Sequence, residues 1–222
     1  MNLKVIIAMV GVAALSAVSM GQGFRGGGMM MGGGGNATFN LRRNDVKEDL
    51  KLTDDQKAKL QEIQDGMRQK FMDAFQAAGD DQAARTKAMT TLMKEVTDQI
   101  NKILTDDQQK RLKEISIQLG GNAVVMQPDI QKDLGFTDDQ KAKIKDLGDR
   151  QQAANREVFQ KMQNGEITRE DIPEIMKKNT KVLNDEIDKI LTQAQKDKLK
   201  SMAGKPFVQT DQPGGGPGGG GR

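Results

Sequence analysis

The chain has 222 residues, a formal net charge of +3, and no histidine, cysteine, tyrosine or tryptophan. Without imidazole or thiolate groups it has no histidine base, no cysteine nucleophile and no zinc or copper centre built from those ligands. Residues 41–119 carry 15 basic and 15 acidic side chains, and residues 129–203 again carry 15 of each. Neither stretch has the basic excess that phosphate binding needs, so nucleic acid is not an expected partner. We expect neither catalysis nor a cofactor.

The first 43 residues are predicted to precede the folded body. A short basic start at Met1–Lys4 is followed by apolar or small residues to position 20, so residues 1–21 are interpreted as a cleaved signal peptide. An uncleaved anchor is the alternative, which the shortness of the apolar run disfavours. Residues 22–43 are interpreted as a Gly/Met-rich flexible linker, and Met29–Met31 is more simply part of it than a Cu(I) site. Export places the chain in a bacterial periplasm.

Four helix starts share one pattern, an apolar residue followed by Thr and, three residues later, Gln. This is the spacing of a capping box, in which the Thr hydroxyl accepts a first-turn N–H and the Gln side chain accepts the N–H of the Thr. Three of the four also carry paired Asp residues in the first turn, where the helix dipole favours negative charge. A metal or acid–base role is the less favoured interpretation of these Asp pairs. The predicted capping residues are Leu52, Thr53 and Gln56; Leu104, Thr105 and Gln108; Phe136, Thr137 and Gln140; and Leu191, Thr192 and Gln195.

The helix starts belong to a duplicated sequence. Residues 45–60 match residues 129–144, and residues 99–105 match residues 186–192. A period this long fits a duplicated helical hairpin better than a solenoid of many copies. The chain is therefore predicted to contain helical hairpin unit 1 at 44–121, helical hairpin unit 2 at 122–204 and a disordered Gly/Pro tail at 205–222.

Helix-forming residues dominate positions 44–203 and no convincing alternating strand interrupts them, which predicts an all-α fold. Pro173 is expected to delay the start of its helix to Asp171 or Ile172. Apolar residues at steps of three and four give each helix one narrow stripe, which favours elongated antiparallel hairpins over a thick core. Long helices are expected at about 54–78, 81–103, 106–119, 138–163, 169–190 and 193–203, with helical turns near 45–50 and 129–134.

An exported, cysteine-free helical chain with repeated Leu-Thr-x-x-Gln helix starts resembles the Spy/CpxP family, the LTxxQ-motif periplasmic proteins, over residues 44–203. The resemblance implies hairpins that pair into a curved cradle, here as a pseudo-dimer within one chain or as a homodimer. It implies a Spy-like ATP-independent chaperone that holds unfolded or misfolded envelope proteins. A CpxP-like regulator of an envelope-stress sensor kinase and an envelope metal-stress protein are the alternatives. The chain departs from the family in its four motifs, its even charge and its lack of the histidine and cysteine that a zinc role would use.

Flexible methionines and a few phenylalanines are the candidate client-binding residues. Thioether side chains adapt to many partners, although gap filling in a loose core explains methionines equally well. Neither Gly-rich tract leads into a nucleotide-binding helix start, so holding of clients would not use ATP. The candidates are Met67, Phe71, Met72, Phe75, Met93, Phe159 and Met162.

Overall fold

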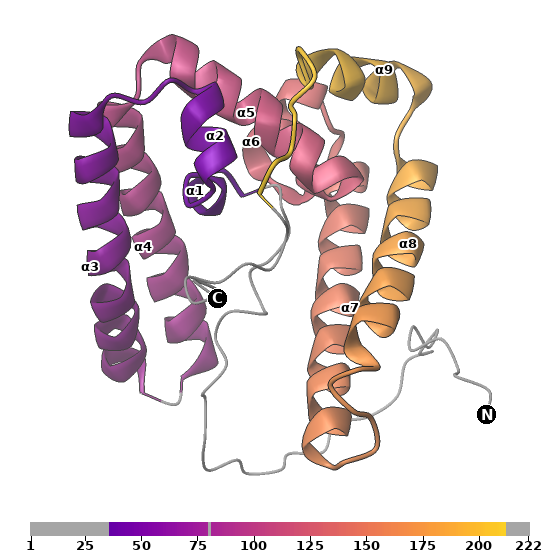
Figure 1. Cartoon of the computed structure of the whole chain (residues 1–222). Helices are drawn as coiled ribbons and strands as arrows, with labels where there is room; N and C mark the ends of the chain where they lie inside the picture. Colours follow the sequence, from indigo (N-terminus) through magenta and orange to yellow (C-terminus); the bar gives the residue numbers. More distant parts are fainter. Residues whose placement is uncertain (1–35, 80, 212–222) are drawn as a thin grey trace. The chain divides into compact units, whose positions relative to one another are not determined.

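The computed structural model describes residues 36–79 and 81–211, and every regular element in these ranges is a helix (Figure 1). The prediction of an all-α fold is confirmed. The predicted signal peptide, most of the predicted linker and the last residues of the predicted tail lie outside the described residues. The elements are α1 (Ala37–Asn40), α2 (Asn44–Asp49), α3 (Asp54–Ala78), α4 (Gln82–Ile103), α5 (Asp106–Gly120), the 3₁₀ helix η1 (Gly121–Met126), α6 (Pro128–Leu134), α7 (Asp138–Gln163), α8 (Ile172–Ile190) and α9 (Gln193–Met202).

The helix bounds follow from local signals in the sequence. The predicted long helices agree with the observed bounds to within three residues at each end. The helix that contains Pro173 begins at Ile172, because proline lacks an N–H and is accepted only in the first turn. The short elements α1 and η1 were not predicted, since neither has a periodic apolar pattern long enough to detect.

The prediction of a flexible linker is wrong for residues 36–43. The Asn36 side chain accepts the N–H of Thr38 at 3.0 Å and caps α1. Leu41 has no exposed surface, and Asn40 donates a buried hydrogen bond to the Ser116 hydroxyl at 3.0 Å. Burial of Leu41 and of this hydrogen bond offsets the entropy of ordering the segment, which the neighbouring glycines alone do not reveal.

The prediction of a disordered tail is wrong for residues 205–211. These residues pack against the unit that contains α1 to α5, where side chains of α2 and α5 bind their backbone. Composition misled here because it measures only the apolar surface that a segment can bury. The order of residues 205–211 comes mainly from hydrogen bonds to groups far away in the sequence.

The described chain divides into two compact units, which we call the N-terminal unit (residues 36–120 and 201–211) and the C-terminal unit (residues 121–200). In the N-terminal unit α3 and α4 lie side by side as a hairpin joined by residues 79–81, and α1 packs on α4 and α5 (Figure 1). Its core consists of Leu41, Val46, Leu50, Leu52, Leu60, Met67, Leu92, Val96, Ile100, Leu104, Leu112 and Ile115.

The C-terminal unit repeats the hairpin with α7 and α8, which lie side by side and contact η1 (Figure 1). Its buried apolar residues are Val124, Val125, Ile130, Leu134, Phe136, Ile144, Leu147, Ala154, Val158, Ile175, Leu183, Ile187, Leu191 and Leu199. Within residues 36–79 and 81–211, no helix combines the length and apolar character that crossing a membrane requires.

Candidate functional site

All four predicted helix starts have the capping hydrogen bonds. In α3 the N–H of Gln56 donates to the Thr53 hydroxyl at 3.2 Å, and the N–H of Thr53 donates to Gln56 Oε1 at 3.0 Å. The same reciprocal pair forms at Thr105 and Gln108, at Thr137 and Gln140, and at Thr192 and Gln195. The apolar residue before each Thr is buried, so each helix start is also held by its unit's core.

The capping glutamines also bind each other, which the sequence did not predict. In the N-terminal unit, Gln56 Nε2 donates to Gln108 Oε1 at 2.7 Å, and Gln108 Nε2 donates to Gln56 Oε1 at 3.0 Å. Each amide also donates to a helix-end carbonyl: Gln56 to that of Ile103 at 2.8 Å, and Gln108 to that of Leu50 at 3.2 Å. The pair therefore ties the start of α3 to the end of α4 and the start of α5 to the end of α2.

The C-terminal unit has the same arrangement in a more buried setting. Gln140 and Gln195 exchange amide hydrogen bonds of 2.8 and 3.0 Å, and each side chain is only 8% exposed. Gln140 also donates to the carbonyl of Ile190 at 3.0 Å. A capping box accepts Glu or Gln, but only an amide both donates and accepts. The use of Gln at all four starts was the available signal for this pairing, whose role is to position the hairpins.

The paired Asp residues of the first turns behave as surface charges. The Asp54 carboxylate lies 3.0 Å from the Lys57 ammonium and that of Asp138 lies 2.9 Å from the Lys141 ammonium, both fully open to solvent. The hydrogen bond from Lys141 lowers the pKa of Asp138. Among the described residues, no three carboxylate, imidazole or thiolate side chains come together as ligands for a metal ion.

The candidate client-binding residues differ in their exposure to solvent. The prediction that Met67 binds clients is wrong, because Met67 lies on the face of α3 that packs into the core and is only 3% exposed. Phe71 and Met93 are half-buried and pack against that core, and Met162 is also half-buried. The exposed candidates are Met72 (58%), Phe75 (40%) and Phe159 (39%).

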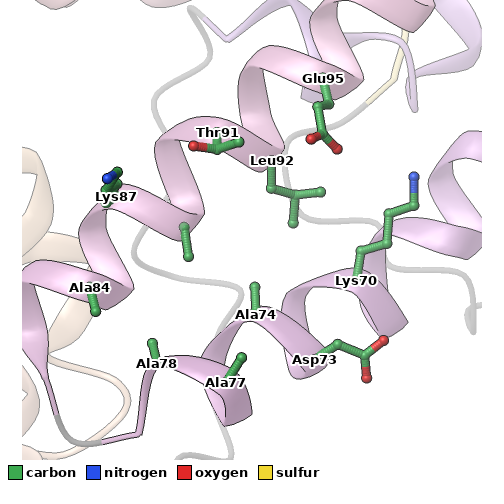
Figure 2. A pocket seen from close by; sticks show the side chains of 11 residues that line it. Lys70, Asp73, Ala74, Ala77, Ala78, Ala84, Lys87, Thr91, Leu92 and Glu95 are labelled. Carbon is green, nitrogen blue, oxygen red and sulfur yellow. The ribbon is translucent and has the colours of Figure 1, made fainter.

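The far end of the α3–α4 hairpin is open. No described side chain between Met67 and Leu92 is buried, although both helices continue through this stretch. The two helices instead border a groove of about 640 Å³ (Figure 2). We call it the alanine groove; it is lined by Lys70, Asp73, Ala74, Ala77, Ala78, Ala84, Lys87, Ala88, Thr91, Leu92 and Glu95.

The duplicated hairpin shows why the groove exists. Continuing the match of residues 45–60 with 129–144 along the helix pairs Ala74 with Val158, and continuing that of 99–105 with 186–192 pairs Ala88 with Ile175. Val158 and Ile175 are both buried at 4% exposure. The α7–α8 hairpin therefore has large apolar side chains where α3–α4 has methyl groups. Small side chains at these two positions leave the end of the first hairpin unfilled.

Charged side chains border the alanine groove, and Phe75 follows Ala74 along α3 without being part of the groove lining. One residue along a helix turns by about 100°, which turns Phe75 away from the face that carries Ala74 and places Met72 on the opposite side of α3. The Arg85 guanidinium of α4 lies 5.8 Å from the centre of the Phe75 ring. Two cations, Lys70 and Lys87, and two anions, Asp73 and Glu95, surround the apolar floor (Figure 2).

Comparisons with protein-family models, curated proteins and solved structures find no significant match to this chain. The functional argument therefore depends on the residues of the chain itself. Within the described residues, the alanine groove offers apolar side chains against which a partner could pack.

Proposed function

We propose that the protein is an ATP-independent periplasmic chaperone of the Spy/CpxP type, which holds unfolded proteins by binding their apolar segments in the alanine groove. The observation that carries the proposal is the unfilled end of the α3–α4 hairpin, where apolar side chains line an open groove. In the α7–α8 hairpin the two equivalent positions are buried. An apolar side chain of a partner that packs into the alanine groove is removed from water, which favours binding. The resemblance of the four capped helix starts to the LTxxQ motif supports the choice of family.

The composition of the groove favours a broad range of clients. Alanine methyl groups and Leu92 contact any apolar side chain, and they impose no hydrogen-bond pattern on it. The rim carries two charges of each sign, so it selects neither acidic nor basic clients. Each client side chain that is buried contributes about 1.5–3 kcal/mol. Two or three such side chains, after the entropy cost of association, give weak and reversible binding, as holding requires.

Light scattering of a denatured client without ATP tests this function. The exported chain is expected to suppress aggregation at equimolar concentration. The double substitution Ala74→Val and Ala88→Ile gives α3–α4 the residues of the equivalent hairpin, and it should abolish most of the suppression while the helices stay intact. Unchanged scattering at several-fold excess of the unmodified chain would reject the chaperone proposal.

The duplication provides a matched control. Phe75 and Phe159 occupy equivalent positions and are equally exposed, but Phe75 follows a residue of the alanine groove, Ala74, whereas Phe159 follows the buried Val158. Phe75→Ser should therefore weaken holding several times more than Phe159→Ser. Equal effects would show that exposed phenylalanine matters and that the groove does not. Capture of one stoichiometric partner from an envelope extract, in place of many weak ones, would favour the CpxP-like regulator.

A further inference from the structure

Residues 203–211 of the N-terminal unit form a second candidate site together with the groups that hold them. The chain leaves the helical conformation after Met202 and continues along the unit that contains α2 and α5 (Figure 1). We call residues 203–211 the C-terminal segment. Its contacts are unusual because they involve backbone atoms much more than side chains.

Two side chains of α5 hold the first half of the C-terminal segment. Gln118 Nε2 donates to the carbonyls of Ala203 at 2.5 Å and Lys205 at 2.9 Å, and Gln118 Oε1 accepts the N–H of Phe207 at 2.7 Å. Arg111 also donates to the Lys205 carbonyl at 2.9 Å. Arg111 is itself fixed by a two-pronged contact with the Asp49 carboxylate, at 2.6 and 3.0 Å. The Arg111 donor is therefore held in place independently of the segment.

The start of α2 holds the second half. Asp45, which is 5% exposed, accepts the N–H groups of Thr210 and Asp211, both at 3.0 Å. Arg43 binds both oxygens of Asp45 and donates to the Asp211 carbonyl at 3.2 Å. Burial would raise the pKa of Asp45, but the hydrogen bonds from Arg43 and the two backbone N–H groups outweigh it and lower the pKa to about 2. Asp45 therefore stays charged as an acceptor for peptide N–H groups.

The side chains of the C-terminal segment contribute little to this contact. Positions 204–206 and 208–210 are exposed, and Val208 keeps 75% of its surface in solvent. Phe207 is the exception, because its ring packs against the core of the N-terminal unit beside the Arg43 guanidinium, 6.0 Å from the ring centre. Asp211 accepts the N–H of Asn44 at 2.5 Å. Recognition thus needs a peptide backbone, one aromatic side chain and one acceptor, and most of this particular sequence is not used.

We propose that Arg43, Asp45, Arg111 and Gln118 form a binding site for peptide segments with an aromatic residue, and that the chain's own C-terminal segment is its resident ligand. A client segment with an aromatic residue in the place of Phe207 can make the same backbone hydrogen bonds. The resident segment then competes with clients and is displaced when unfolded protein is abundant. The identity of the competing peptide as a client rests on the proposed chaperone function, whereas the site itself does not.

Gly204 provides a way to loosen the segment without changing the site. Its φ of +63° is strained for any residue with a side chain, and an added Cβ would overlap the Glu114 side chain, which Arg111 holds at 2.9 Å. Gly204→Val therefore disfavours the bound position. Gly165→Val is the matched control: Gly165 has a φ of +73° in the C-terminal unit, and an added Cβ meets no atom within 4 Å.

Displacement is measured with a spin label on the otherwise cysteine-free chain. Val208→Cys places a single thiol on the exposed side of the C-terminal segment. A synthetic peptide with the sequence of residues 203–211 is then added to the labelled full chain. Because a tethered ligand has an effective concentration of roughly millimolar, the peptide should mobilise the label at millimolar concentrations. In the Gly204→Val background, mobilisation should need at least tenfold less peptide, while Gly165→Val should behave as the unmodified chain.

Two further measurements complete the test. A peptide with Ser in place of the Phe should be at least tenfold weaker, and Gln118→Ala should release the label before any peptide is added. A label that stays immobile in the Gly204→Val chain at saturating peptide, or equal potency of the two peptides, would overturn the proposal. The groove-filling substitutions at Ala74 and Ala88 should leave displacement unchanged, so failure of this site and failure of the chaperone proposal are distinguishable.

Discussion

Replacing Gln140 by Ala tests whether the LTxxQ-type glutamines act as helix caps alone or as paired supports of the hairpin. Gln140 Oε1 accepts the N–H of Thr137 at 3.1 Å and the amide of Gln195 at 3.0 Å. Its Nε2 donates to Gln195 Oε1 at 2.8 Å and to the Ile190 carbonyl at 3.0 Å. Gln140→Ala removes four hydrogen bonds and leaves the polar groups of Gln195 and Ile190 without their partner in a buried setting.

The magnitude separates the two roles. A lost Thr cap costs about 1 kcal/mol, which is the expectation for Thr137→Ala. A buried polar group left unsatisfied costs about 1–3 kcal/mol, so Gln140→Ala should reduce the free energy of unfolding by about 3 kcal/mol. The difference is measured by urea denaturation followed by circular dichroism. A cost for Gln140→Ala no greater than that for Thr137→Ala would refute the pairing role.

A double-mutant cycle isolates the amide pair. Once Gln140 is absent, Gln195→Ala removes fewer intact hydrogen bonds, so the two substitutions should couple by about 1 kcal/mol or more. Gln140 and Gln56 share no hydrogen bond, and the same cycle on these two residues serves as the control with little coupling. Additive costs for Gln140 and Gln195 would contradict the geometry.

Three further predictions concern stability. Asn179 is 1% exposed, its Nδ2 has no hydrogen-bond partner in the described part of the chain, and the equivalent residue in the first hairpin is Leu92. Asn179→Leu should therefore raise the free energy of unfolding by about 1–2 kcal/mol. A thermal melt measures this change, and a lowered Tm would contradict the prediction. Ala74→Val with Ala88→Ile adds five carbon atoms to the alanine groove. Each buried carbon contributes about 0.8 kcal/mol, and because the groove is half open the free energy of unfolding should rise by about 2 kcal/mol in urea. A destabilised variant would argue against an unfilled groove. The pKa of Asp45 in the folded chain is about 2, below its ordinary value of 3.8. The charged Asp45 therefore contributes about 2 kcal/mol to the free energy of unfolding above about pH 4, and this contribution is lost as the pH falls toward 2. A pH titration of the Val208→Cys spin label should show this transition, and Asp45→Asn should abolish it.

Local sequence patterns were sufficient to predict where the helices begin and end, but they did not predict the contacts between helices. Thr53 and Thr137 mark helix starts because a cap involves residues only three apart. The Gln56–Gln108 and Gln140–Gln195 pairs join residues 52 and 55 positions apart, and a pattern within one helix contains no information on such contacts. The binding of Phe207 by Gln118, 89 positions away, is hidden for the same reason.

Periodicity also identifies the buried face of a helix without showing how far along that face the burial extends. Met67 and Phe75 are eight positions apart in α3, a spacing that keeps both near one face of the helix, yet Met67 is in the core and Phe75 is 40% exposed. The difference arises on the facing helix, where Leu92 reaches the core and Ala88 does not fill the space beside it. Burial at a given position depends on the volume of the side chains across the interface, which a stripe on one helix does not contain.

The comparison of the two units supports the alanine groove as the proposed binding surface. Both have the capped helix starts, the glutamine pair and an exposed phenylalanine at the same position, so these shared features serve the hairpin itself. What differs is the end of the hairpin, closed by Val158 and Ile175 in one unit and open above Ala74 and Ala88 in the other. Filling that end would contribute stability at no cost to the fold. The apolar surface that the C-terminal unit covers and the N-terminal unit leaves open is therefore the surface that we propose for binding a partner.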